Sequence, residues 1–150
     1  MSLDKLLDDL ATHAPPQTPE DAAAIEKGLG EVVASSETMT DAQIDRLYRM
    51  LTDSAKFQEV LWSVMQVIEL QERAKHVEAF ARNLAYMRDN APDWAETMVC
   101  RIMNSGLGDD LLASVRTHES AAPLRSVLEP LAADKKSKVA AIASGLLDRL

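Results

Sequence analysis

The chain has little of several residue types that characterise whole classes of protein. It has one cysteine in 150 residues, which excludes an internal disulfide framework or a multi-thiolate metal site and agrees with a reducing compartment. Aromatic residues make up only 4%, too few for the stacking platforms that bind single-stranded nucleic acid. The longest apolar runs, VLWSVM and VAAIA, are far shorter than the about 18 residues that cross a bilayer.

The first ten residues, MSLDKLLDDL, lack the basic start and apolar stretch of a secretory signal peptide. We therefore expect a cytoplasmic protein without a membrane partner. The net charge of −8 is unevenly placed: residues 1–60 hold 12 acids against 5 bases, and residues 61–150 hold 12 against 11. An acidic front repels nucleic acid and favours a basic protein as partner, although acidic helix faces also simply keep a domain soluble.

Apolar residues recur at helical spacing along nearly the whole chain, without the period-two alternation of strands, which predicts an all-α fold. Three helix starts carry capping signals. Ser2 opens a helix to about His13, and Thr18 with Pro19 opens the second. Thr40 and Gln43 form a capping box that opens a third helix, to about residue 52.

Six later helices follow from the apolar pattern. Trp62 widens the apolar face of the first of them, Asn90 is placed to cap the helix that starts at Pro92, and Pro130 should bend or end its helix early. The residues 35–37 are the expected linker. The predicted ranges are 54–71, 72–90, 92–104, 109–118, 121–133 and 135–150.

The helix starts near Thr40, Glu72 and Gly108 are about 32 to 36 residues apart, close to the length of a two-helix solenoid unit. We therefore expect stacked antiparallel helix pairs, a HEAT-like superhelix of eight or nine helices, with a simple helical bundle as the alternative. One domain should span 1–150, with acidic N-terminal helices in 1–53 and a helical core in 54–150.

The lone Cys100 is a candidate nucleophile, but its helix places it beside Asp93 and Glu96. Carboxylates raise the pKa of a thiol, and no histidine lies one turn away to activate it. The other acids lack partners at the spacing of a general acid and base. We therefore predict that the chain is not an enzyme and has no catalytic residues.

A metal site is the alternative that would overturn this prediction. Glu69, Glu72 and His76 lie within two helical turns and could touch one ion. A ferritin-like di-metal site, however, needs Glu-x-x-His on two helices, and that pattern is absent. We therefore expect no metal and no cofactor, and keep a small metal-dependent helical enzyme as an alternative.

Two segments carry a family resemblance. LWSVMQVIEL, with Trp62 and Glu69, and AFARNLAYMRDNAPDWAETMVCRIMNS resemble the all-helical immunity proteins that accompany bacterial polymorphic toxins and contact-dependent growth-inhibition toxins. The likeness spans about 57–150, and the first 55 residues carry none of it. It implies a helical stack that binds the toxin domain of its own operon in the cytoplasm and blocks it without catalysis.

The resemblance also assigns structural roles. The second segment contains Pro92, Trp94, Arg101 and Asn104. Trp62 and Trp94 are expected to be structural, and Trp94 should fill the core at the start of its helix. Arg101 and Asn104 should bind carbonyls near a helix end.

Toxins of such systems are often basic nucleases, so an acidic face could cover a cationic active-site cleft and speed association. A convex C-terminal surface is the competing contact region, and a helical adaptor with a different partner is the competing function. The expected partner-binding residues are Asp8, Asp9, Glu20, Asp21, Glu26, Glu31, Glu37, Asp41 and Asp45.

Overall fold

A computed structural model describes residues 1–35 and 37–150 of the chain. These residues form ten helices and no strand, which confirms the all-α prediction. The helices are α1 (Leu3–Ala11), α2 (Pro19–Ala34), α3 (Asp41–Tyr48), α4 (Gln58–Glu69), α5 (Arg73–Arg82), α6 (Leu84–Asn90), α7 (Pro92–Asn104), α8 (Gly108–Thr117), α9 (Ala121–Ala133) and α10 (Ala140–Arg149).

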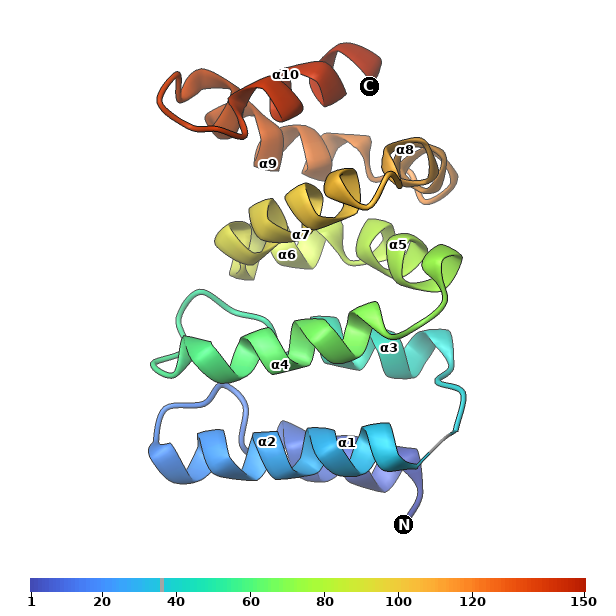
Figure 1. Cartoon of the computed structure of the whole chain (residues 1–150), viewed down its shortest axis with the longest axis vertical. Coiled ribbons are helices and arrows are strands. Elements are labelled where there is room, and N and C mark those ends of the chain that lie inside the picture. The colour runs from blue at the N-terminus through green and yellow to red at the C-terminus, as the bar shows by residue number, and fades with distance from the viewer. Residues whose placement is uncertain (36) are drawn as a thin grey trace.

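The helices stack in layers from the N-terminus to the C-terminus (Figure 1). One series, α1, α3, α5 and α8, is connected by packing of each helix on the next, and we name it the α1 row. A second series consists of α2, which packs on α4, and α7, whose Trp94 and Arg101 contact α4, and we name it the α2 row. Helices α2 and α4 lie in front of α1 and α3 in Figure 1. The helix α9 packs on α6, α7 and α10, which closes the C-terminal end of the stack. A continuous apolar core runs through all layers, from Leu3 to Leu146.

The three capped starts are confirmed. The side chains of Ser2, Thr18 and Thr40 accept hydrogen bonds from backbone N–H groups in the first turns of α1, α2 and α3. At Thr40 the capping box is complete, because the Gln43 side chain also accepts from the backbone of Thr40. The predicted linker at 35–37 includes Ser36, which lies outside the described residues.

The helix predicted over 72–90 is wrong in one respect: Asn83 divides it into α5 and α6, which brings the count to ten. The backbone of Asn83 has φ −100° and ψ 7°, outside the helical region. Its buried side-chain amide donates to Ala79 O at 2.7 Å and to Asp45 Oδ1 at 2.8 Å. An Asn that binds nearby carbonyls competes with helix propagation, and the contact with α3 fixes the break.

Two predicted bounds around residue 52 are also wrong. Helix α3 ends at Tyr48 rather than near 52, and α4 begins at Gln58 rather than 54. The loop between them is held by the first residue of α4, because the Gln58 amide donates to the carbonyls of Thr52, Asp53 and Ala55 at 2.6 to 3.2 Å. Its polar groups therefore find partners without a helix.

The predicted cap of α7 is wrong as well. The Asn90 side chain donates back to Tyr86 O at 3.0 Å, and the first turn of α7 is capped by Asp53, whose Oδ2 accepts from Asp93 N at 3.0 Å. The backbone N–H of Asp53 donates to Asn90 O at 3.1 Å. The loop before α4 therefore stabilises the start of a helix 40 residues later.

The C-terminal helices agree with expectation in one case and differ in another. Helix α9 has the predicted bounds, Ala121–Ala133, and Pro130 does not end it early. Helix α10 begins at Ala140 rather than at 135. The side chains of Asp134 and Ser137 accept from N–H groups two residues ahead, a local turn that competes with helix formation.

No helix in the described part of the chain is long and apolar enough to cross a membrane.

Buried His76 predicts a pH-dependent stability. Its side chain is 7% exposed, and its Nδ1 has no hydrogen-bond partner among the described residues. Burial lowers the pKa of His76, partly offset by the Glu69 carboxylate. The unfolded chain therefore binds this proton more readily, so stability is complete above the ordinary pKa of about 6.5 and falls as the pH drops below it.

We expect His76→Gln to flatten the decline of unfolding free energy between pH 7 and pH 5, by at most about 1.4 kcal/mol per pH unit, the limit for one proton. Urea denaturation of both proteins at several pH values measures this. An identical pH dependence in the variant would contradict it.

Candidate functional site

Two of the acids predicted to contact a partner form close pairs between helices of the α1 row. Asp8 on α1 pairs with Arg46 on α3 at 2.7 Å, and Asp45 on α3 pairs with Arg82 on α5 at 2.8 Å. Further along the α1 row, Glu78 on α5 pairs with His118, the residue that follows α8, at 3.1 Å. These pairs link successive helices of the α1 row and contribute to its internal packing.

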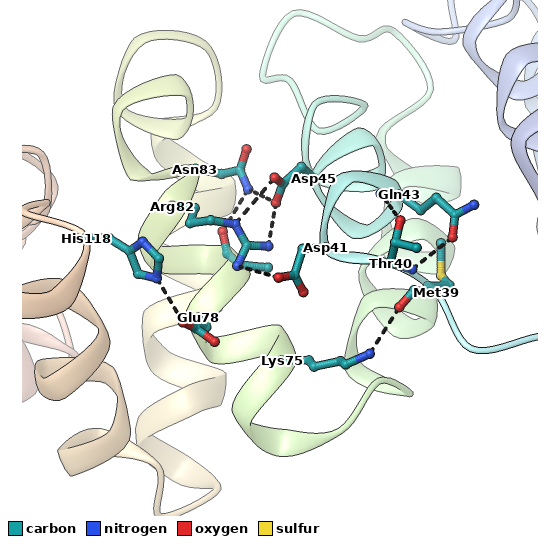
Figure 2. A network of polar contacts seen from close by, with 11 residues as sticks. Met39, Thr40, Asp41, Gln43, Asp45, Lys75, Glu78, Arg82, Asn83 and His118 are labelled. Carbon is teal, nitrogen blue, oxygen red and sulfur yellow. Dashed lines mark hydrogen bonds and ion pairs between the residues drawn. The ribbon is translucent and has the colours of Figure 1, made fainter.

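Figure 2 shows the centre of this arrangement. The Asp45 carboxylate accepts from Arg82 Nη2 at 2.8 Å and from Asn83 Nδ2 at 2.8 Å, while Asp41 lies 3.9 Å from Arg82 Nη1. Lys75 Nζ donates to the carbonyl of Met39, just before α3 begins. Asp45 and Arg82 are both partly buried, so this network joins α3 to the break between α5 and α6.

The other predicted acids lie on α1, on α2 and, in the case of Glu37, between α2 and α3. Asp9 pairs with Lys5 on its own helix, and Glu26 accepts from the hydroxyl of Ser63 on α4. Asp21 pairs with His13, whose hydrogen bond lowers the pKa of the Asp21 carboxyl. Three are exposed, and their carboxylates form no hydrogen bond or ion pair with the described residues: Glu20, Glu31 and Glu37.

Charge is distributed unequally between the two rows. The three helices of the α2 row contain eight acids and two bases, a net of −6 out of −8 for the chain. The four helices of the α1 row contain eight acids and six bases, a net of −2. The α2 row is therefore the acidic part of the molecule, and it produces the field that a charged partner meets.

Helix α4, in the middle of this row, exposes a face of both apolar and polar side chains. Trp62, Gln66 and Leu70 follow one another at steps of four residues, and all three are exposed. Trp62 is 44% exposed and Leu70 is 68% exposed. The prediction that Trp62 widens the apolar core face is therefore wrong: the buried side of α4 is formed by other residues, and Trp62 points outward.

A groove of about 670 Å³ runs between α2 and α4 on this side. Val33, which is 51% exposed, and Leu70 provide apolar surface, while Glu26 and Gln66 provide polar groups. Arg101 of α7 lies at its margin. An open, mostly apolar groove with charged edges suits a protruding side chain of another protein better than an enclosed small molecule.

The two tryptophans, Trp62 on α4 and Trp94 on α7, contact each other where α4 meets α7. Their ring centroids are 5.0 Å apart, at an edge-on angle of 70°. Trp94 is only 6% exposed, and its indole N–H donates to Gln58 Oε1 at 2.8 Å. Together with Asp53 and Asp93, they line a second hollow of about 260 Å³. Trp94 therefore occupies the core position expected of it, whereas Trp62 covers it from outside.

Arg101 does not bind carbonyls as predicted. Its guanidinium pairs with the Glu69 carboxylate, with Nε 2.9 Å and 3.0 Å from the two oxygens and Nη2 2.8 Å from Oε1. This hydrogen bond raises the pKa of Arg101. Asn104 is exposed, and no hydrogen bond among the described residues involves its side chain. Arg101 instead connects α7 to α4 across the α2 row.

Two of the residues considered for a metal site are otherwise engaged in the fold. Glu69 is engaged by Arg101, and His76 is buried. No group of three or more His, Cys, Asp or Glu residues in the described ranges could hold a metal ion. Burial, reinforced by Glu96, raises the pKa of the Cys100 thiol, the direction predicted from its acidic neighbours.

One comparison with known proteins gives a result. The family model described as immunity protein 30 matches residues 16–112, about two thirds of the chain. The chain belongs to the immunity protein 30 family. No curated protein and no solved structure matches it.

The range of the immunity protein 30 match corrects the extent of the resemblance. It includes residues 16–56, which lie outside the predicted resemblance at 57–150, and it ends at 112, in the middle of α8 and before α9 and α10. All three helices of the α2 row fall inside the match.

Sequence reasoning missed the exposed apolar residues of this immunity protein 30 chain. Val33 and Leu70 were not singled out, because an isolated Val or Leu near a helix end is usually part of the core. The signal was present in the spacing of Trp62, Gln66 and Leu70, which lie on the side of α4 opposite its buried residues.

Proposed function

We propose that this chain binds a cognate bacterial toxin domain in the cytoplasm and neutralises it by covering its active site. Membership of the immunity protein 30 family carries the proposal. We propose further that the toxin domain is basic and acts as a nuclease. The net charge of −6 on the α2 row supports a cationic partner.

Inhibition of this kind requires no reactive group on the immunity protein. A nuclease holds phosphates in a positively charged cleft, so an acidic surface of another protein competes for the same space and the same field. Opposite charges also speed encounter, which matters when the toxin must be captured before it damages nucleic acid. Inhibition then requires only a surface of complementary shape in direct contact with the toxin domain, and the stack of helices provides such a surface.

Co-expression with the toxin domain encoded beside this gene tests the proposal. We expect cells to survive induction of the toxin domain only when this chain is present, and the two proteins to purify as a stable complex. A toxin domain from an unrelated system serves as the control, and the chain should not protect against it. Equal killing with and without the chain, together with no complex, would refute the proposal.

A second measurement addresses the mode of inhibition. If the toxin domain degrades nucleic acid, its activity on a purified substrate should fall to background at one equivalent of the chain, and its affinity for a short DNA or RNA should fall in parallel. Retention of nucleic acid by the inhibited complex would mean that the active site is not covered.

A further inference from the structure

We propose that the α2 row is the toxin-docking surface, and that its centre is the exposed α4 stripe of Trp62, Gln66 and Leu70 with the groove beside it. The occupant is a basic patch of the toxin domain with a projecting apolar side chain. This inference rests on the proposed function and specifies which surface performs it.

Charge complementarity identifies the partner. The α2 row carries −6, and its two bases do not offset its eight acids. One of these bases, Arg101, is already bound to Glu69. The exposed acids Glu20 and Glu31 of α2 and Glu59 of α4 lack ion pairs with the described residues. A second copy of the chain would bring acids against acids, so a cationic protein fits this surface better.

The centre of the surface has the composition of a binding hot spot. Trp62, Val33 and Leu70 are three of the four large apolar side chains that are exposed in the described residues. The fourth, Met1, lies at the chain start. Exposed apolar residues gathered within a polar rim mark interaction sites, and tryptophan is among the residues most enriched there.

The surface is also held in shape before any partner arrives. The edge-on contact with Trp94 supports Trp62, and the two-oxygen pairing of Arg101 with Glu69 joins α4 to α7. On the other side, the Ser63 hydroxyl donates to Glu26 and joins α4 to α2. Preorganised side chains lose little conformational entropy on binding.

The α1 row is the weaker candidate, because most of its acids already have partners among the described residues. Asp8, Asp45 and Glu78 pair with side chains of the next helix in the row. A toxin that used them would have to break those pairs.

Lysine substitutions test the assignment. Gln66→Lys and Leu70→Lys place a positive charge at exposed positions in the centre of the surface, where the fold tolerates it. Ala74→Lys on α5 and Ala113→Lys on α8 place the same charge at exposed positions of the α1 row. Binding of the purified, inactivated toxin domain encoded beside this gene is measured by calorimetry at low and high salt, with circular dichroism to confirm folding.

We expect the Kd of Gln66→Lys and Leu70→Lys to rise by about 30-fold or more, the effect of losing a hot spot, and the two controls to stay within about threefold of the wild type. Unchanged affinity of both α4 variants, or a larger loss in the controls, would overturn the docking assignment while leaving the proposed function intact. A wild-type chain that does not bind the toxin domain would overturn the proposed function and this inference together. Loss of a dimer in the α4 variants without loss of toxin binding would identify the face as a self-interface and also overturn it.

Discussion

Trp94→Ala should lower the free energy of unfolding by about 3 to 5 kcal/mol, the range for removing a large buried aromatic side chain. Trp94 is 6% exposed, and its loss would remove three things at once: packing against α4, the support of the Trp62 ring, and the hydrogen bond to Gln58. Because the Gln58 amide holds the carbonyls of residues 52, 53 and 55, the loop before α4 should loosen as well.

Two further variants separate these contributions. Trp94→Phe keeps most of the ring but removes the indole N–H, and we expect a loss of about 1 to 3 kcal/mol from the unpaired Gln58 carbonyl and the smaller volume. Trp62→Ala should cost less than Trp94→Ala, because its side chain is 44% exposed. Chemical denaturation of the three proteins gives the comparison, and equal losses for Trp62→Ala and Trp94→Ala would contradict the assigned roles.

Asp45→Ala should destabilise the fold by about 2 to 3 kcal/mol, because it leaves the partly buried Arg82 guanidinium without its carboxylate and removes one acceptor from Asn83. The break between α5 and α6 depends on this contact, so amide hydrogen exchange should increase around residues 79–86. Asp45→Asn keeps an acceptor oxygen but not the charge, and we expect an intermediate loss. Thermal or urea unfolding measures both.

The matched control is Glu20→Ala, an exposed acid without an ion pair among the described residues, for which we expect a change within about 0.5 kcal/mol. Toxin binding of folded Asp45→Ala should equal that of the wild type. A variant of Asp45 that remains fully stable but loses the toxin would return this residue to the contact surface.

The features that the sequence predicts correctly are local. The starts of α1, α2 and α3 depend on a side chain and a backbone N–H three residues apart, and such pairs are visible in any window of the sequence. The helical class follows from apolar periodicity in the same way. The raised pKa of the Cys100 thiol is also predicted from a neighbour on the same helix, Glu96.

The failed predictions involve partners that are distant in sequence. Asn83 breaks its helix with the help of Asp45, 38 residues earlier, and α7 is capped by Asp53, 40 residues before Asp93. Helix propensity alone favours a continuous helix through Asn83 and a cap at Asn90. Propensity depends on neighbouring residues and contains no information on which distant segments come into contact. Arg101 was assigned to carbonyls for the same reason, since Glu69 lies 32 residues away.

The candidate site was predictable only in its charge. The sequence shows that the first third of the chain is acidic, but not which acids already have partners within the fold. Asp8, Asp41 and Asp45 could be distinguished from Glu20 and Glu31 only once α1, α3 and α5 were placed side by side. The exposure of Leu70 and Trp62 likewise depends on the direction in which α4 faces.

Acids of the α1 row are mostly paired and acids of the α2 row are mostly unpaired, and this difference has an evolutionary consequence. The ion pairs between α1, α3, α5 and α8 maintain the architecture, whereas most acids of α2, α4 and α7 hold nothing in place. Substitutions of those unpaired acids therefore leave folding nearly untouched. At the proposed docking surface, recognition of a changing toxin can therefore evolve by single substitutions while the fold is kept.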